Sequence, residues 1–209
     1  MSILDHLAGA LGRRDEVPNV ELAKRIAAKK DKAAVKELAE NLRHKSKDIR
    51  HDCIKVLYET GYADPELIAP YWKEFLALLD DKSNRMQWGA MSALSSIAGE
   101  RPKEIYAALD RIMAAADSGS VITRDHAMSI LLKLAAVKQY ASDAFTLYLD
   151  QLRTAPVNQL PKYAEDAAAL VPAKDARLFV KILSSRLDEI DKDSKRKRVE
   201  KVMRKLGGA

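Results

Sequence analysis

The side chains that could carry out chemistry are few in this sequence, and their spacing favours no catalytic site. The four histidines, at positions 6, 44, 51 and 126, show no HExxH spacing, and Cys53 is the single cysteine. A zinc site needs several such ligands on neighbouring turns, and a redox site needs a second thiol. Glycine-rich phosphate loops and nucleophile-elbow sequences are also absent from the chain. We therefore predict no catalytic residue, no metal and no cofactor.

Two polar features have structural interpretations that we favour over catalysis. Arg124, Asp125 and His126 form a polar cluster at the expected start of a helix, where an aspartate is stabilised by the helix dipole. Cys53 stands at a position that alanine fills in the equivalent segments. We interpret Cys53 as a small buried residue, since free cysteine commonly packs like one.

The composition predicts an all-α protein in the cytoplasm. Glycine, proline and aromatic residues are scarce, with 8 Gly, 7 Pro and 6% aromatic residues. No segment approaches the roughly 18 apolar residues of a membrane span, and residues 1–14 do not resemble a signal peptide. The net charge of +6 arises from 36 basic and 30 acidic residues. Such a mixed surface permits binding to anions but does not by itself indicate a nucleic-acid-binding protein.

The elements that position these side chains repeat along the chain. Apolar or small residues recur at steps of 37 positions, at Cys53, Ala90, Ala127 and Ala164. A second column follows at Leu57, Leu94, Leu131 and Ala168, and a third at Thr60, Ile97, Leu134 and Val171. Preceding helices keep the same step, as in Val35 and Trp72 or Leu38 and Phe75. Repeats of this length bury a core by stacking on their neighbours.

The repeat pattern predicts a right-handed α-solenoid of about five stacked antiparallel helix pairs. We expect a single domain over residues 1–209, with an N-terminal helix or cap at 1–18, repeats at 19–206 and a tail at 207–209. Asn19 and Asp31 are expected to cap the first two helices of the repeats. Gly61 and Gly99 are expected to end later helices in the left-handed conformation.

The period, the helix pairs and segments such as Asp64-Pro65-Glu66-Leu67-Ile68 resemble HEAT repeats or the related armadillo class. Pro70 matches the proline of the first helix, Asp81 the aspartate of the turn, and Arg50 and Arg124 the basic residue that starts the second helix. Gln87 and Pro161 depart from that pattern. The resemblance implies a scaffold or binding surface without naming its partner.

Second helices line the concave side of such solenoids, so their core-opposed face is the candidate binding surface. Three columns form it, and we expect them to be exposed: His51, Trp88, Asp125 and Lys162; Lys55, Ser92, Ser129 and Asp166; Glu59, Ser96, Lys133 and Leu170. Trp88 is the strongest candidate for an interface anchor, because a tryptophan offers a large contact area and an N–H donor. The structural alternative is that Trp88 packs against Arg85 or Tyr58. The predicted partner-binding residues are Trp88, Arg85, Lys55, Asp125, Ser129, Lys133 and Lys162.

A second candidate site lies in the basic C-terminal segment. Lys197, Lys201, Arg204 and Lys205 share one face of the expected last helix and could bind phosphates or an acidic partner. The structural alternative, which we favour, is the solvated outer face of a capping helix, whose cations also stabilise the helix C-terminus.

These observations favour a non-catalytic scaffold or adaptor that binds a protein along its second helices. The alternative is a nucleic-acid-binding protein. One form of it is a DNA glycosylase, because some alkylpurine DNA glycosylases are built from HEAT-like repeats. Trp88, Asp125 and Arg124 could be imagined around a lesion, but no glycosylase or bilin lyase motif matches this sequence residue by residue. A third hypothesis is a structural subunit whose end repeats dock into a larger assembly.

Overall fold

The computed structural model describes residues 2–207, and the regular elements in that range are all helices, as the composition predicts. The chain divides into two compact units, residues 1–130 and 131–209, and each is described by itself. That the chain forms a single domain therefore stays a prediction. No helix within residues 2–207 has the length and apolar character needed to cross a membrane.

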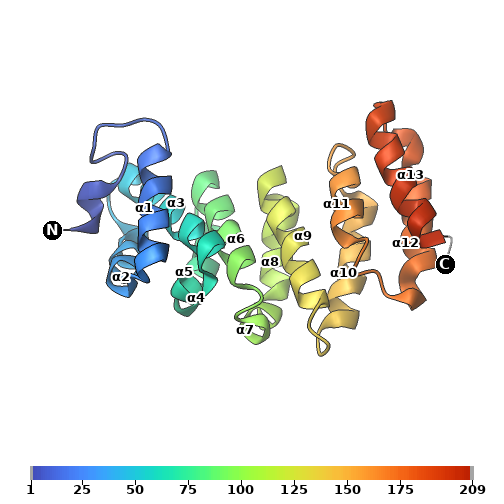
Figure 1. The fold of residues 1–209 in the computed structure, drawn as a ribbon, viewed down its shortest axis with the longest axis horizontal. Coiled ribbons are helices and arrows are strands. Elements are labelled where there is room, and N and C mark those ends of the chain that lie inside the picture. Colours follow the sequence, from blue (N-terminus) through green and yellow to red (C-terminus); the bar gives the residue numbers. More distant parts are fainter. Residues whose placement is uncertain (1, 208–209) are drawn as a thin grey trace. The chain divides into compact units, whose positions relative to one another are not determined.

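The first unit consists of helices joined by short turns. Its α-helices are α1 (Val17–Lys29), α2 (Lys32–Glu40), α3 (Lys47–Ala63), α4 (Pro65–Ile68), α5 (Trp72–Ala77), α6 (Asn84–Ile97), α7 (Pro102–Ala107), α8 (Leu109–Ser118) and the start of α9 (Val121–Ala135). Short 3-10 helices occur at Ile3–His6, Asn41–Arg43, Ala69–Tyr71 and Leu78–Asp80. The long helix α3 packs against both α1 and α6, and α5 packs on α6 (Figure 1).

The second unit contains the end of α9 and four further α-helices, α10 (Ala141–Thr154), α11 (Leu160–Ala167), α12 (Ala176–Ser185) and α13 (Asp193–Gly207). Short 3-10 helices lie at Ala173–Asp175 and Leu187–Glu189. The last helix packs against both α11 and α12. Pro161 lies in the first turn of α11, where a missing N–H removes no helix hydrogen bond.

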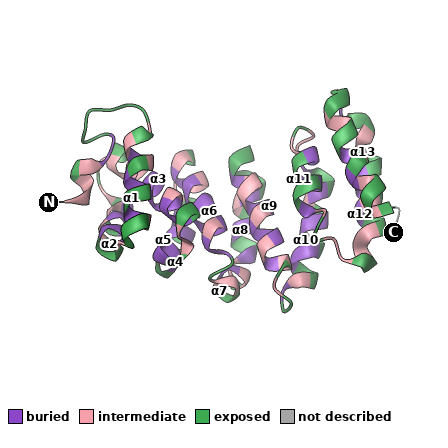
Figure 2. Ribbon diagram, in the orientation of Figure 1, coloured by how far each residue is buried: buried purple, intermediate pink, exposed green. Residues whose placement is uncertain are grey.

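The repeating columns are buried in the first three copies, as predicted, whereas Ala168 and Val171 of the fourth copy lie beyond the end of α11 and are only half-buried. Cys53, Ala90, Ala127 and Ala164 are all fully inaccessible to solvent. Leu57, Leu94 and Leu131 are equally buried one turn later in their helices. Figure 2 shows that buried residues run along these helices. The 37-residue step therefore corresponds to the side of each second helix that faces the core.

Two of the expected first helices are divided in two. In one, α4 and α5 are separated by the 3-10 turn Ala69–Tyr71, which contains Pro70. Proline cannot donate a helix hydrogen bond and obstructs the preceding turn, so the helix breaks there. In the next, α7 and α8 meet at Ala108. These repeats thus have three helices, a pattern that occurs in the armadillo class.

Gly61 does not end its helix, contrary to the sequence prediction. Helix α3 continues to Ala63, and among the described glycines only Gly12 has a positive φ. A Cβ at Gly61 would lie 2.4 Å from both Ile68 Cδ1 and Ser96 Oγ. Glycine is present here because α3 approaches α4 and α6 closely. Gly99, which follows α6, also lacks the left-handed conformation. A left-handed helix end does occur at α1, where the residue in that conformation is Lys30.

Gly89→Ala is expected to lower the free energy of unfolding by about 1–2 kcal/mol, because overpacking outweighs the helix propensity of alanine. A Cβ at Gly89 of α6 would lie 2.8 Å from Cγ1 of Ile54 on α3, a stiff β-branched side chain. Gly99→Ala is the control, since no atom lies within 4 Å of its Cβ position. Urea denaturation of both variants measures the difference. Equal stabilities would show that α3 and α6 are not closely packed at Gly89.

The N-terminal segment forms the short 3-10 helix Ile3–His6 and is held in place by a buried polar residue. Asn19 does not cap α1, which begins at Val17; it lies inside the helix and is inaccessible to solvent. Its side-chain oxygen accepts from the Ala8 N–H at 2.9 Å, and its Nδ2 donates to Asp52 at 2.8 Å. Asp52 also accepts from the Gly9 N–H at 2.8 Å. By contrast, Asp31 caps α2 as predicted, accepting from the Ala34 N–H.

Candidate functional site

One face of α3 carries a row of polar and aromatic side chains. His51, Lys55, Tyr58 and Tyr62 follow one another at steps of four, three and four residues, so they lie along one side of the helix. Arg85, Trp88 and Ser92 occupy the neighbouring helix α6. Because α3 and α6 pack against each other, these two rows form one surface.

Lys55 and Ser92 were expected to be exposed, and both are buried. Lys55 is 8% exposed and Ser92 only 1%. The Lys55 ammonium donates to Glu59 at 2.7 Å and lies 2.9 Å from Glu16. Glu16 precedes α1, so its ion pair with Lys55 brings the start of α1 over the lysine side chain. A lysine in this position holds two elements together and offers little surface to a partner.

Glu16 also binds Arg85, at 2.6 Å, so one carboxylate joins α3 and α6. Burial opposes the charge of Glu16, but hydrogen bonds and attraction from Lys55 and Arg85 outweigh it and leave its pKa below the usual value. Burial likewise opposes the charge of Lys55, and its hydrogen bonds to Glu59, Tyr58 and Glu16 raise its pKa. Glu16 and Lys55 are therefore both charged at neutral pH.

An aromatic cluster, consisting of Tyr58, Tyr62, Trp88 and His126, joins the second helices of the first unit. Tyr58 lies 5.7 Å from both Tyr62 and Trp88 between ring centroids, and Tyr62 lies 6.5 Å from His126. Trp88 is half-buried against Tyr58, which agrees with the structural alternative. Tyr62 is 51% exposed. The cluster thus combines a buried ring, Tyr58, with an exposed one, Tyr62. Aromatic residues with this mixture of burial and exposure are common at binding surfaces.

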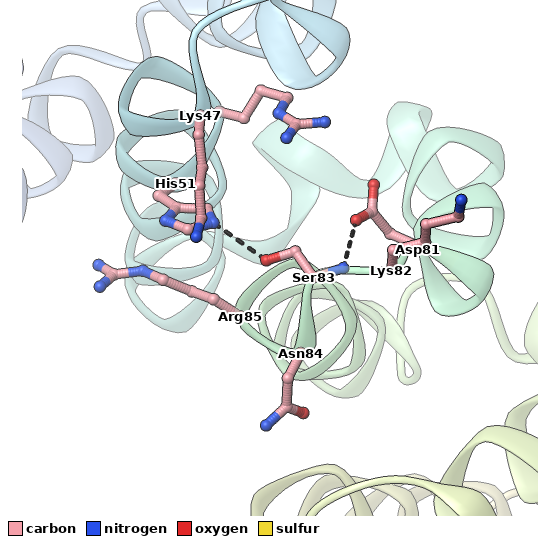
Figure 3. A pocket seen from close by; sticks show the side chains of 8 residues that line it. Lys47, His51, Asp81, Lys82, Ser83, Asn84 and Arg85 are labelled. Atoms are coloured by element: carbon pink, nitrogen blue, oxygen red, sulfur yellow. Dashed lines mark hydrogen bonds between the residues drawn. The ribbon is translucent and has the colours of Figure 1, made fainter.

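A basic pocket lies where α3 and α6 begin. Its volume is about 650 Å³, and it is lined by Lys47, Arg50, His51, Asp81, Lys82, Ser83, Asn84 and Arg85. Figure 3 shows His51 and Ser83 facing each other across it, with Nε2 and Oγ 3.0 Å apart. Asp81, the one carboxylate of the lining, accepts from the Ser83 N–H at 2.7 Å. The pocket therefore combines four permanent cations with one carboxylate that already has a backbone partner.

Acidification is expected to destabilise the protein below about pH 6.5, partly through His51. Burial is the main cause that lowers the pKa of His51, aided by the charges of Arg85, Lys47 and Arg50 and opposed by Asp48. Between the folded pKa and the unfolded value, the unfolded chain binds more protons, so stability falls as the pH falls. Denaturation of the wild type and His51→Gln at pH 7.5 and 5.5 measures this contribution. An unchanged pH difference in the variant would contradict it.

The other predicted partner-binding residues have separate environments. Asp125 and Ser129 lie half-buried on α9, beside His126 of the aromatic cluster. Lys133 and Lys162 belong to the second unit, so nothing places them beside Trp88. Lys162 is exposed on α11 and binds Asp166 at 2.8 Å.

The predicted anion-binding residues of the C-terminal helix are on its exposed side, as expected for a capping helix. Lys197, Lys201, Arg204 and Lys205 are all exposed on α13. Lys197 binds Asp193 at 2.7 Å within the same helix. None of these four residues lines the cavity that adjoins Leu206.

The single cysteine lies in the core. Cys53 is inaccessible to solvent, and burial, aided by Asp52 and Glu37, raises the pKa of its thiol to about 12. This confirms that Cys53 packs in the core. No group of three or more potential metal ligands is gathered within residues 2–207.

Two contributors to this surface were missed by the sequence analysis. Tyr62 follows the row of His51 and Lys55 by eleven and seven residues, so helical periodicity could have revealed it. Glu16 carries no such signal, because it reaches Arg85 from 69 positions away. Only the folded chain shows that an acidic residue lies between the two cations.

Comparison with known proteins establishes the fold and not the family. No family model matches the chain, and no curated protein matches its sequence.

Solved structures of engineered repeat proteins are similar in fold. One engineered protein from the Northeast Structural Genomics Consortium is 19% identical with a TM-score of 0.65, covering 100% of this chain and 98% of its own. A designed armadillo repeat protein in complex with the peptide (KR)4 is 15% identical with a TM-score of 0.68, covering 89% and 86%. Computationally designed armadillo repeat proteins for modular peptide recognition include one that is 13% identical, with a TM-score of 0.66 and coverage of 97% and 98%. The chain thus has an all-α fold similar to that of armadillo-type repeat solenoids over its full length.

Proposed function

We propose that this protein is a non-catalytic module that binds an extended peptide segment of a partner across α3 and α6. The observation that carries the proposal is the aromatic cluster beside the basic pocket, since both are built from second helices of adjacent repeats. Tyr62 supplies an exposed aromatic contact, and tyrosine and tryptophan are common anchors at interfaces. The solved complex of a designed armadillo protein with (KR)4 is consistent with this use of the fold.

The residues at this surface favour a binding role over catalysis. Lys55, Arg85 and Glu16 neutralise one another in fixed ion pairs, so none is poised to transfer a proton. Trp88 is held against Tyr58, which limits the space that a flipped base would need beside it. The glycosylase form of the nucleic-acid hypothesis therefore has no local support in the first unit.

Selection from a random peptide library tests the proposal. The immobilised full-length chain would be exposed to twelve-residue peptides, and the retained sequences compared with those retained by Tyr62→Ala. We expect a consistent motif for the wild type and loss of that motif in the variant. Failure of the wild type to enrich any sequence would contradict the proposal.

A further inference from the structure

We infer that the basic pocket between α3 and α6 binds the phosphate group of a phosphorylated serine or threonine in that peptide. This inference rests on the proposed function, because it assigns a chemical class to the same partner. It concerns the residues around the first turns of the two helices, of which the sequence analysis assigned only His51 and Arg85 to a binding surface and none to a phosphate.

The charges of the pocket are arranged to receive an anion. Lys47, Arg50 and Lys82 form no ion pair with a carboxylate in the described part of the chain, although carboxylates bind many other cations there. The Nε atoms of Arg50 and Arg85 are buried and have no hydrogen-bond partner within residues 2–207. A buried N–H without an acceptor is costly, so neither guanidinium group has all its donors paired in the unbound protein.

The backbone adds to the same attraction. Helices α3 and α6 both begin at the pocket, at Lys47 and Asn84, and helix N-termini stabilise negative charge. Figure 3 shows Lys47 and His51 on α3 facing the start of α6, with Lys82 on the opposite side. Positive charges from two helices and a turn therefore converge on one point. This arrangement suits the compact, multiply charged phosphate group, which arginine can bind with two hydrogen bonds.

The surroundings favour one isolated phosphate over a nucleic-acid backbone. A second cavity shares His51 and Arg85 with the pocket. Its lining also includes four carboxylates and two further arginines, namely Asp15, Glu16, Asp48, Asp52, Arg13 and Arg14. A chain of phosphates leaving the basic pocket on that side would meet these carboxylates. A peptide with one phosphate would avoid them.

Glu16 shows that Arg85, a cation of the pocket lining, accepts an anion, since its carboxylate already binds Arg85. The distance to the aromatic cluster suggests the form of the peptide. His51 and Tyr62 are eleven residues apart on α3, or about 16 Å at 1.5 Å per residue. An extended peptide spans that distance with about five residues. We therefore place an aromatic or large apolar residue about five positions from the phosphate.

Paired peptide libraries test this inference. In both libraries a central serine is fixed and the flanking residues are random. The libraries differ only in whether that serine is phosphorylated. Fluorescence anisotropy with the full-length chain is expected to show at least tenfold tighter binding of the phosphorylated library. Lys47→Gln/Arg50→Gln should abolish that preference by lowering the affinity for the phosphorylated library to that for the unphosphorylated one.

The matched control is Arg25→Gln/Lys29→Gln, which removes two exposed charges from α1 outside the pocket. This control should keep the phosphate preference. Since Arg50 is partly buried, Lys47→Gln/Lys82→Gln supplies a second test with two exposed residues, and it should reduce the preference as well.

Three outcomes would overturn the inference. Equal binding of the two libraries would show that the pocket takes no phosphate, while the proposed peptide-binding function would stand. Equal losses in the pocket and control variants would indicate general charge attraction. Tighter binding of a ten-residue thymidine oligonucleotide would assign the pocket to nucleic acid. Absence of binding by either library would instead contradict the proposed function itself.

Discussion

Asn19→Asp is expected to lower the free energy of unfolding by about 3 kcal/mol, because it places a second carboxylate against Asp52 where Asn19 now donates a hydrogen bond. The position is inaccessible to solvent, so water cannot separate the two charges. One carboxylate must bind a proton or the N-terminal segment must detach. Urea denaturation at pH 7 measures the loss, and acidification should partly reverse it.

A charge exchange provides the control. In Asn19→Asp/Asp52→Asn, the carboxylate introduced on α1 can accept from the Ala8 N–H and from the amide introduced on α3, whose oxygen can accept from the Gly9 N–H. The double variant should therefore recover most of the lost stability. A loss equal to the sum of the two single variants would show that Asn19 and Asp52 do not act as a hydrogen-bonded pair.

Tyr62→Ala is expected to weaken peptide binding by 10- to 100-fold, or about 1.4–2.7 kcal/mol, the range of a strong interface anchor. Because Tyr62 is 51% exposed, its removal should cost little stability, unlike that of the half-buried Trp88. Tyr62→Phe separates the contribution of the ring from that of the hydroxyl. We expect Tyr62→Phe to retain most of the affinity.

Tyr71→Ala is the matched control, since Tyr71 lies in the turn between α4 and α5 and not on a second helix. Fluorescence anisotropy with peptides selected by the wild type would measure all three variants. A Tyr62→Ala variant that binds as tightly as the wild type would remove the aromatic cluster from the binding surface.

The core and the helix order could be predicted from the sequence because they depend on periodicity. Columns such as Cys53, Ala90 and Ala127 repeat a local apolar pattern, and burying that pattern requires the helices to stack. The division of a first helix into two parts was harder to predict. Pro70 was noted only as a family feature, and its effect on the helix depends on whether neighbouring contacts preserve the turn.

The site was harder to predict because it depends on contacts between distant segments. Helical geometry placed Lys55 opposite Cys53 and therefore in solvent, but Glu16 folds over the lysine from before α1. Gly61 looked like a helix stop, although its small size serves the close approach of α6. Periodicity gives the direction of a side chain from its helix, whereas these residues are defined by what arrives from elsewhere in the chain.

The most direct test is a ¹H–¹⁵N spectrum of the tryptophan indoles during titration with a selected peptide. The chain has two tryptophans, Trp88 on the proposed surface and Trp72 in α5, so each spectrum contains its own control. Trp72→Phe would assign the signals. We expect the Trp88 signal to shift in proportion to binding while the Trp72 signal stays in place. A bound peptide that shifts Trp72 and leaves Trp88 unchanged would contradict peptide binding across α3 and α6.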